Sequence, residues 1–510
     1  MSQLGASARL AGAVWALARA DALIPREAEP LLPPGPKLLG RVLRLVSGRR
    51  ARRGRPGERL ARTLERLGPV AIKLGQVLST RADIFGNDFA EDLGRLKDRL
   101  DPFPTAEAKA AVAQTLGRPL EGLYGRFDEP VAAASLAQAH RACLLDGTEV
   151  AVKVLRPGIE RRVALDIETL TLAARLVEGL GPEARRLEPR ALAATVSRSL
   201  ELELDLRFEA AGASELGEVM DRDGYMRAPR VVWDGVGKRA LTLTWAPGLP
   251  LSEAAALEQP GLNRRALADN LIRGFLSQAL DHGVFHADLH EGNLFVGPPA
   301  VITAVDFGIL GRLGQAERRY LAEILYGFLE RDYRRVAQSH FDAGYVPAHH
   351  SVDSFAQALR AVGEPIFGRP AQDVSMGQVL AQLFDITALF DMRLRPELVL
   401  LQKTMAMAEG VARRLWPEHD IWTASDPVVR RYIINELAPP ARLRRLAEHG
   451  LKAAEALLQR LDRGEPEPTA VVIAEPVTVD LARAAPHRLL WFAIGAAVAG
   501  LAFALTALVL

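Results

Sequence analysis

Cysteine is almost absent from this chain, which has only Cys143 among its 510 residues. A single cysteine excludes an internal disulfide and is compatible with a reducing compartment. Excess charge is also absent: the net charge is +2 at neutral pH, so no bulk attraction to nucleic acid is expected. Arg9 and Arg19 interrupt the apolar residues of the first twenty positions, so no cleavable signal peptide is expected either. The length allows two or three domains with sizeable cores.

The most informative pattern is the stretch H-A-D-L-H-E-G-N, which begins at His286 and is followed by D-F-G beginning at Asp306. Together the two are typical of the catalytic and metal loops of kinases. Phosphoryl transfer needs a carboxylate near the attacking oxygen, and an amide and a second carboxylate that hold magnesium. Asp288, Asn293 and Asp306 supply these groups in order, and residues 301–305 predict a strand leading into Asp306. D-F-G alone would be read as a buried turn, but the two motifs together favour phosphoryl chemistry.

A lysine that reaches nucleotide phosphates is expected upstream of such loops. Lys153 lies in a predicted strand at 149–155 and stands in V-A-V-K, the tetrapeptide context of that lysine. Alone it would be a solvated strand residue; the downstream motifs favour phosphate binding. Its carboxylate partner is expected on a helix predicted over 191–213, where like charges four residues apart would repel by a few tenths of a kcal/mol. The acids on that segment are Glu201, Glu203, Asp205 and Glu209, and the cations that could meet them are Lys153 and Lys73.

Two features of ordinary protein kinases are missing. The position before the lysine strand has no glycine-rich loop; an alanine-rich stretch over 132–140 stands there instead. Alanine carries a Cβ and cannot adopt positive φ as freely as glycine, so a stiffer loop is expected. No Ala-Pro-Glu follows D-F-G, and residues 312–329 predict an amphipathic helix that leaves little room for an activation loop. Phosphorylation of protein substrates is therefore disfavoured.

The periodicity of apolar residues predicts an α+β, two-lobed, protein-kinase-like fold with an N-terminal helical extension and a C-terminal transmembrane helix. Gly68-Pro69 should divide the extension into two helices. Strands are expected at 231–233 and 240–245, and, apart from the D-F-G region, helix is expected from there to about residue 461. The predicted domains are an N-terminal segment with a basic run (1–55), the helical extension (56–126), a small lobe (127–250), a larger helical lobe (251–462), a linker (463–486) and a membrane anchor (487–510).

Two segments suggest a membrane. The basic run between Lys37 and Arg55 is either a solvated linker or a surface attracted to anionic headgroups. The apolar, uncharged segment 489–510 would span roughly 33 Å as a helix, enough to cross a bilayer. Arg483 and Arg488 precede it, which by the positive-inside rule predicts a cytoplasmic catalytic domain. A buried core helix is the alternative, disfavoured by the Pro-containing polar linker before the segment.

Taken together, the motifs resemble the UbiB family of atypical kinases, which includes the ADCK proteins of mitochondria and chloroplasts. Four ordered signatures carry the resemblance. They are K-L-G-Q from Lys73 to Gln76, the alanine-rich loop Ala132 to His140, the E-L-D of Glu203 to Asp205 continued by Glu209, and the two loops His286 to Asn293 and Asp306 to Gly308.

The resemblance implies a kinase-like fold that binds ATP or ADP with Mg²⁺ and supports ubiquinone biosynthesis at a membrane, here the bacterial inner membrane with a single span. It implies that Asp288 orients the attacking water or hydroxyl, and that Asn293 and Asp306 bind magnesium. Glu209 is the first candidate partner of Lys153 and Glu203 the second. The nucleotide-binding residues implied are Lys153, Ala132, Ala133, Ala134, Ser135, Thr244 and Ala246. The regulatory K-x-G-Q residues implied are Lys73, Gly75 and Gln76, which would act with Asp205 over the site where a protein substrate would dock.

The chain also departs from the family pattern. Leu289 and Glu291 replace prolines that are common in the catalytic loop, which predicts a less rigid backbone there. Thr244 stands where a glutamate is often found. One span is recognisable where bacterial relatives often have two, and Gly495 and Gly500 could support a homodimer.

Three functions fit these expectations to different degrees. The first is an ATPase or small-molecule kinase acting on membrane lipid and polyprenyl quinone intermediates. The second is a non-catalytic, nucleotide-gated scaffold that presents such lipids to other ubiquinone biosynthesis enzymes. The third, polyprenylphenol hydroxylase, is a label attached to some relatives; the sequence shows no dinucleotide-binding glycine fingerprint, iron-ligand triad or cysteine cluster to support it.

Overall fold

The computed structural model describes residues 3–437 except 24–25, 28–33, 44–53, 80–86, 95, 97–100, 180–184, 186–187, 368–381, 383–385, 387–388 and 393–395. The predicted linker and membrane anchor at 463–510, and most of the basic run, lie outside these residues. No helix in the described part of the chain has both the length and the apolar character required to cross a membrane. The described residues form two compact units, Met1–Ala211 with Val231–Trp245, and Gly212–Arg230 with the residues that follow Trp245.

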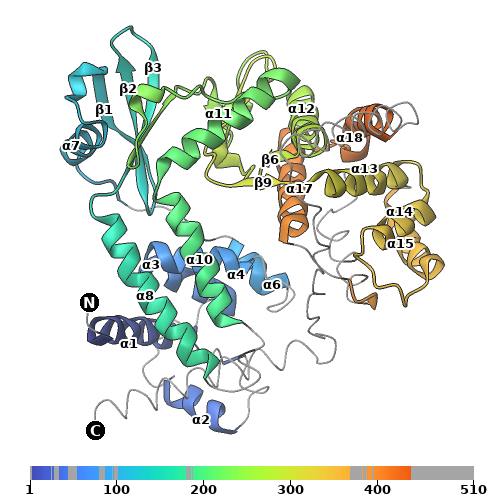
Figure 1. Cartoon of the computed structure of the whole chain (residues 1–510), viewed down its shortest axis with the longest axis horizontal. Helices are drawn as coiled ribbons and strands as arrows, with labels where there is room; N and C mark the ends of the chain where they lie inside the picture. Colours follow the sequence, from blue (N-terminus) through green and yellow to red (C-terminus); the bar gives the residue numbers. More distant parts are fainter. Residues whose placement is uncertain are drawn as a thin grey trace, which may run out of the picture. The chain divides into compact units, whose positions relative to one another are not determined.

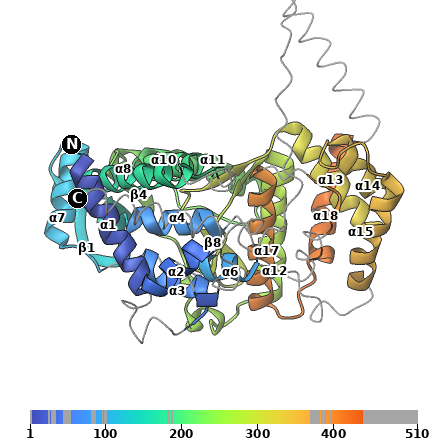
Figure 2. The ribbon, with the colours of Figure 1, turned by 90° about the horizontal axis from the view of Figure 1, so that it is seen from below.

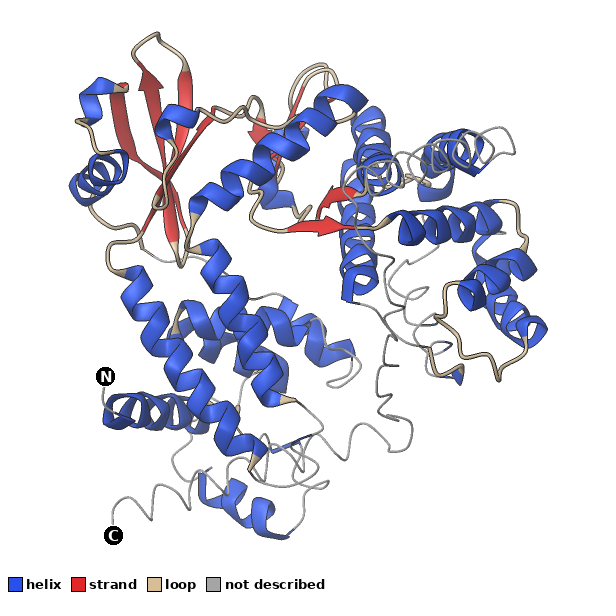
Figure 3. Cartoon of the chain, in the orientation of Figure 1, coloured by secondary structure: helices blue, strands red, loops and turns tan. Residues whose placement is uncertain are grey.

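The first unit combines an antiparallel sheet with a group of helices (Figures 1 and 3). Its strands are β1 (Tyr124–Ala133), β2 (Ala137–Leu144), β3 (Glu149–Leu155) and β4 (Ala240–Thr244), ordered β1-β2-β3-β4. Its helices are α1 (Gln3–Arg19), α2 (Pro34–Leu43), α3 (Pro56–Leu67), α4 (Pro69–Ser79), α6 (Asn87–Gly94), α7 (Thr105–Leu116), α8 (Ile159–Glu178) and α10 (Pro189–Glu203), with the short helices η3 (Leu120–Gly122) and η4 (Trp233–Gly235).

Gly68 separates α3 from α4, as predicted, because it adopts a φ of 107° and is followed by a proline that begins the next helix. The helices of the extension share a core with the sheet. Val70 of α4, Leu200 of α10, Leu155 of β3 and Leu241 of β4 belong to one buried cluster. The helices around Lys73 are therefore packed into the sheet-bearing unit.

The second unit is mostly helical but carries two small sheets. One has the order β5-β7-β8, and the other pairs β6 with β9. Its strands are β5 (Leu249–Pro250), β6 (Val284–His286), β7 (Leu294–Gly297), β8 (Val301–Ala304) and β9 (Leu310–Arg312). Its helices are η5 (Ala254–Leu257), α12 (Arg264–Ser277), the π-helix η6 (Gln278–His282), η7 (Glu291–Asn293), α13 (Gln315–Leu329), α14 (Tyr333–Asp342), α15 (Val352–Phe367), α17 (Pro396–Leu415), α18 (Ile421–Tyr432) and the π-helix η9 (Ile433–Leu437).

Within this unit α12 and α17 pack side by side, and α14 packs against both α13 and α15 (Figure 2). Helix α11 (Leu206–Asp223) begins in the first unit and continues into the second. Side-chain caps fix several helix starts: Asn263 accepts from the amide of Ala266 in α12, and Asp420 accepts from that of Trp422 in α18.

Three predicted elements were wrong. The helix expected over 191–213 is two helices, α10 and α11, separated at Leu204 and Asp205. The strand expected at 231–233 is one isolated bridge from Val231 to Leu243, because a short 3₁₀ helix begins at Trp233. The region after residue 250 is not helical throughout. Strand β6 precedes the predicted catalytic loop, β7 follows it, and β9 follows D-F-G. Such three- and four-residue strands are too short for periodicity to identify.

A close backbone approach in the β6–β9 pair makes a stability test possible. A Cβ at Gly311 would lie 2.1 Å from Cζ of Phe285, whose ring is fully buried. We expect Gly311→Ala to destabilise the protein by about 1–3 kcal/mol through overpacking. At Gly410 in α17 an added Cβ would meet no atom within 4 Å, so Gly410→Ala should instead stabilise by about 0.5–1 kcal/mol. Thermal unfolding of the two variants should shift in opposite directions; a shift in the same direction would contradict the packing described.

Candidate functional site

Lys153 projects from β3, the strand paired with both β2 and β4. Its Nζ lies 2.8 Å from Oε1 and 2.9 Å from Oε2 of Glu209, which stands in the first turn of α11. The first turn of a helix favours a carboxylate because its free amides point towards it. Glu209 is buried, whereas Lys153 keeps about a third of its side chain exposed. The strand lysine is thus held in place by a buried carboxylate, while part of its side chain stays exposed.

Glu203 pairs with the other candidate cation. Lys73, buried in α4, forms an ion pair with Oε1 of Glu203 at the end of α10, and Ser199 also donates to that oxygen. The break between α10 and α11 therefore separates the two acids, and each meets its own lysine. Lys73 is directed at the first acid of the E-L-D signature.

Asp205 does not meet Lys73. Its Oδ1 accepts from the backbone amide and Nε of Arg207, and its Oδ2 accepts from the same guanidinium at 2.6 Å. The hydrogen bond from Arg207 holds the pKa of Asp205 below its usual value. Because Asp205 lies between two helices, the expected repulsion from Glu209 on a shared helical face does not arise. The sequence predicted that Lys153 or Lys73, from elsewhere in the fold, would meet these acids. For Asp205 this was wrong, because its cation is Arg207, two residues along the chain.

Gly75 and Gln76 lie in α4 beside Lys73. A Cβ at Gly75 would come within 2.8 Å of Leu64 and still closer to Leu96, so glycine allows α4 to pack closely against α3 and the residues after α6. Gln76 is half-buried, and its carbonyl accepts from the Ser79 hydroxyl. Within the K-x-G-Q motif, Gly75 therefore allows close helix packing and Lys73 forms the ion pair.

The alanine-rich stretch forms the turn between β1 and β2. Ala132 and Ala133 end β1, and Ala134 donates through its amide to the carbonyl of Ala137 at 2.8 Å. Ser135 is buried. Arg156, which follows β3, donates from Nε to the carbonyl of Ala134 and from its amide to that of Leu136.

A second set of contacts holds the strand just after this turn. Gln138 donates to and accepts from the backbone of Phe103, and its amide nitrogen also meets Nε2 of His140. Nδ1 of His140 donates to the carbonyl of Asp128, and burial lowers the pKa of His140. The turn is fixed from both sides. Arg156 and Gln138 could not be recognised from the sequence because they bond mainly to backbone groups, which leave no mark in a motif.

Thr244 and Ala246 end this region of the chain. Thr244 is the last residue of β4 and pairs with Val150 of β3. Ala246 is buried and begins the second of the two chain segments that form the second unit. The connection continues to Gly248, which adopts a φ of 93° and lies so close to the backbone of Val296 that a Cβ would be 2.4 Å from its carbonyl oxygen.

In the second unit a buried histidine organises the predicted catalytic and metal loops. Nδ1 of His286 accepts from the amide of Asp288 at 3.1 Å, and its Nε2 donates to the carbonyl of Val305, also at 3.1 Å. Burial lowers the pKa of His286, which keeps the imidazole neutral as this pattern requires. The ring also packs edge-on against Phe307. One side chain thus joins the residue before Asp306 to Asp288, the residue expected to orient the attacking water or hydroxyl.

Asn293 lies beside both loops. Its side-chain Nδ2 donates to the backbone carbonyl of Asp288 at 3.1 Å, and its backbone carbonyl accepts from the amide of Val305 at 2.8 Å. The pairing of Leu294 with Ala304 in the β7–β8 ladder produces this arrangement. With its nitrogen committed, Asn293 offers its amide oxygen to a ligand.

Asp306 has a φ of 63°, a rare conformation for a residue other than glycine. Its Oδ1 accepts from the amide of Gly308. The backbone carbonyl of Phe307 approaches Gly212 of α11 so closely that a Cβ there would lie 3.1 Å from it. Two oxygen donors, from Asn293 and Asp306, are what Mg²⁺ prefers. The donor chemistry therefore fits magnesium.

Two residues of α17 support the catalytic loop, and the sequence reasoning missed both. Thr404, fully buried, donates from its hydroxyl to the carbonyl of Ala287 at 3.1 Å. Arg414 forms an ion pair with Glu291, one of the residues that replace a family proline. Neither could be recognised from the sequence, because they lie more than a hundred residues after the loop.

Comparison with known proteins identifies the family. The ABC1 atypical kinase-like domain matches residues 95–340, and the UbiB helical domain matches residues 359–420. The chain is 41% identical over 399 residues to the "Probable protein kinase UbiB" of Marinobacter nauticus, covering 77% of this chain and 73% of that protein. It is 39% identical over 447 residues to the protein of the same name in Pseudomonas aeruginosa, covering 85% and 84% of the two chains. The chain belongs to the UbiB family.

The family assigns a kinase-like domain to the region that contains Lys153, Glu209 and both loops. A solved structure of Rv3197 from Mycobacterium tuberculosis in complex with erythromycin is also similar, with 22% identity, a TM-score of 0.48, and coverage of 72% of this chain and 93% of that one.

The contacts of Arg156 lead to a prediction about the alanine-rich turn. Arg156→Gln removes the side-chain donor to Ala134 while leaving the backbone unchanged. Loss of one charged hydrogen bond of about 1.5 kcal/mol should accelerate amide exchange in residues 130–138 by about tenfold. Hydrogen exchange followed by mass spectrometry measures this.

Arg141→Gln is the matched control, because Arg141 stands on β2 but pairs at the surface with Glu149. It should leave exchange in the turn unchanged. Equal acceleration in both variants would mean that Arg156 does not fix the turn.

Proposed function

We propose that this UbiB-family protein is a membrane-associated, kinase-like ATPase that uses ATP or ADP with Mg²⁺ and supports ubiquinone biosynthesis. It acts on, or presents, polyprenyl lipid intermediates. The observation that carries the proposal is the network in which His286 and Asn293 order Asp288 and the chain leading into Asp306.

Each group has a role that its chemistry suits. Lys153, oriented by Glu209, neutralises phosphate charge. Asn293 and Asp306 would hold magnesium, which would supply positive charge to offset that of the phosphates. Asp288 orients the attacking water or hydroxyl through a carboxylate whose backbone amide is fixed by His286.

Protein substrates are disfavoured in this proposal. Only residues 313 and 314 separate β9 from α13, so the D-F-G region runs almost directly into a helix. Protein kinases need a longer activation loop between these points, whose phosphorylation and ordering control activity. A small acceptor or water requires no such platform, which supports lipid-directed or hydrolytic chemistry.

The proposal predicts magnesium-dependent ATP turnover by the full-length protein in detergent with added lipid. Asp306→Asn should reduce turnover on the order of 100-fold, since a bound metal contributes several kcal/mol to the transition state and about 1.4 kcal/mol is worth tenfold. Asp353→Asn is the matched control. Asp353 lies in α15, 47 residues after Asp306 in the chain, and forms an exposed ion pair with Arg334 of α14.

Binding and turnover are measured on the same samples. If nucleotide binds but no phosphate is released by the unmutated protein, the nucleotide-gated scaffold is the correct function. In a strain lacking the protein, a prenylated ring precursor should accumulate and be cleared by the unmutated gene but not by Asp306→Asn. If Asp306→Asn also cleared the precursor, the protein would support the pathway without catalysis that depends on Asp306.

The two lysine–glutamate pairs give a second prediction. Glu209→Gln should weaken the affinity for magnesium–ATP about tenfold, because it releases the lysine assigned to the phosphates and costs about 1.5 kcal/mol. Glu203→Gln removes the same charge from the Lys73 pair and should change nucleotide affinity less than about twofold. Titration with a fluorescent nucleotide measures both; equal losses would contradict the separate roles.

A further inference from the structure

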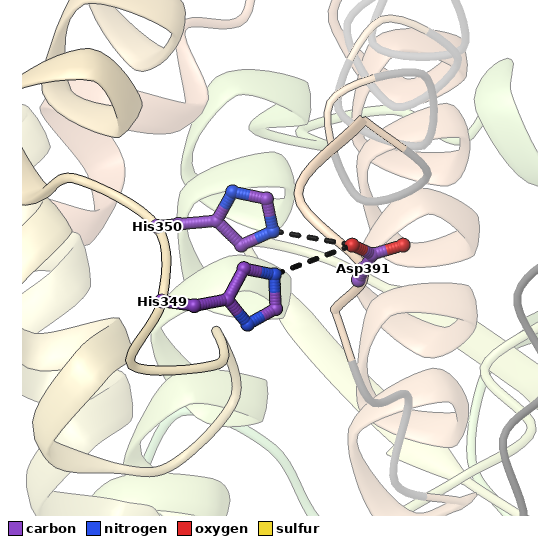
Figure 4. Close-up of side chains that lie close together, drawn as sticks. All are labelled: His349, His350 and Asp391. Carbon is purple, nitrogen blue, oxygen red and sulfur yellow. Dashed lines mark hydrogen bonds and ion pairs between the residues drawn. The ribbon is translucent and has the colours of Figure 1, made fainter.

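Two histidines and one aspartate lie close together in the helical part of the second unit. In the chain they follow the predicted catalytic and metal loops by about forty residues or more. His349 and His350 are consecutive in the segment between α14 and α15, and Asp391 lies 41 residues beyond His350 in the chain. Nε2 of His350 is 3.2 Å, and Nε2 of His349 is 3.7 Å, from Oδ2 of Asp391. Figure 4 shows both imidazoles turned towards this carboxylate.

The protein holds one of these imidazoles in place. The ring of His350 lies 5.2 Å from that of Phe390, which packs at 4.9 Å on Phe355 in a buried aromatic group. His350 is accordingly only about one-fifth exposed, and its Nε2 faces outward to Asp391. Asp391 adopts a φ of 50°, a conformation that aspartate accepts at lower cost than most residues.

The distances are compatible with a shared metal ion. Nε2 of His350 is within hydrogen-bonding distance of Asp391, whereas Nε2 of His349, at 3.7 Å, is too far for a hydrogen bond. Ligand atoms at about 2.0–2.1 Å from a tetrahedral ion lie roughly 3.3 Å apart. The two measured separations, 3.2 and 3.7 Å, lie on either side of that value. All three ligand atoms are within 4.8 Å of one another.

We propose that His349, His350 and Asp391 bind a first-row transition-metal dication of the Zn²⁺ type. Imidazole nitrogens select zinc, copper, nickel or iron over magnesium and calcium, which prefer oxygen ligands only. Three protein ligands leave a further position to water. The ion ties the segment before α15 to the segment that leads towards α17, the helix whose Thr404 and Arg414 support the catalytic loop.

The test uses the untagged full-length protein in detergent with millimolar Mg²⁺, which occupies sites built from oxygen. Zn²⁺ is titrated by calorimetry, and Co²⁺ is added separately to record its visible d–d bands. We expect one equivalent of Zn²⁺ to bind and raise the thermal unfolding midpoint. Each of His349→Ala, His350→Ala and Asp391→Asn should weaken binding at least about tenfold and abolish the Co²⁺ bands.

Asp353→Asn serves again as the control, because it removes a nearby carboxylate of the same type without touching the cluster. It should bind Zn²⁺ like the unmutated protein. Asp391→Asn preserves the shape of the side chain, and circular dichroism of the metal-free variants establishes that they are folded. Failure of the unmutated protein to bind stoichiometric Zn²⁺, or equal binding by Asp391→Asn, would overturn the proposal. Either result is independent of ATP turnover.

Discussion

The predicted catalytic and metal loops of this protein are joined by one neutral imidazole. His286 accepts a hydrogen bond from Asp288 with one ring nitrogen and donates to Val305 with the other, so a single tautomer joins the catalytic loop to the strand end before Asp306. A charged imidazole could not accept from Asp288, and burial disfavours that charge. Backbone hydrogen bonds from Val305 to Asn293 and from Ala287 to Ile309 join the same segments, and the His286 side chain adds a contact directly to the amide of Asp288.

The chain also uses a helix break to separate two charges. Had residues 191–213 formed one helix, Asp205 and Glu209 would have shared a face, as the sequence suggested. The break at Leu204 lets Asp205 accept from the amide of Arg207 at the start of α11, so the apparent repulsion becomes a stabilising contact. Glu203 and Glu209 then belong to different helices and meet different lysines. The stretch 203–209 thus contributes one acid to the Lys73–Glu203 pair and another to the Lys153–Glu209 pair.

What the sequence revealed, and what it hid, follows from the range of each interaction. Lys153 and the two loops were recognisable because their chemistry requires fixed residue types at fixed spacing. The choice of Glu209 over Glu203 was only a preference, since it depends on where a helix ends. Arg156, Gln138 and Thr404 were invisible, because a side chain that bonds a backbone group places no demand on the identity of its partner. Arg414 was missed because its partner, Glu291, lies more than a hundred residues before it in the chain. The short strands β6, β7 and β9 were missed because three or four residues carry too little periodicity. The membrane span at 489–510 stays a prediction.

The loss of a rigid residue in the catalytic loop illustrates how such hidden contacts compensate. Sequence alone suggested that Glu291, in place of a proline, loosens the backbone. In the structure Glu291 pairs with Arg414, and Thr404 of the same helix donates to the carbonyl beside Asp288. Proline restricts a chain by removing conformations from the unfolded state, whereas these contacts restrict it only once the protein has folded. Order in the loop therefore depends on α17, which lies in the region matched by the UbiB helical domain. This dependence gives a physical reason for the kinase-like domain to be followed by those helices: they complete the support of a loop that its own sequence does not hold rigid.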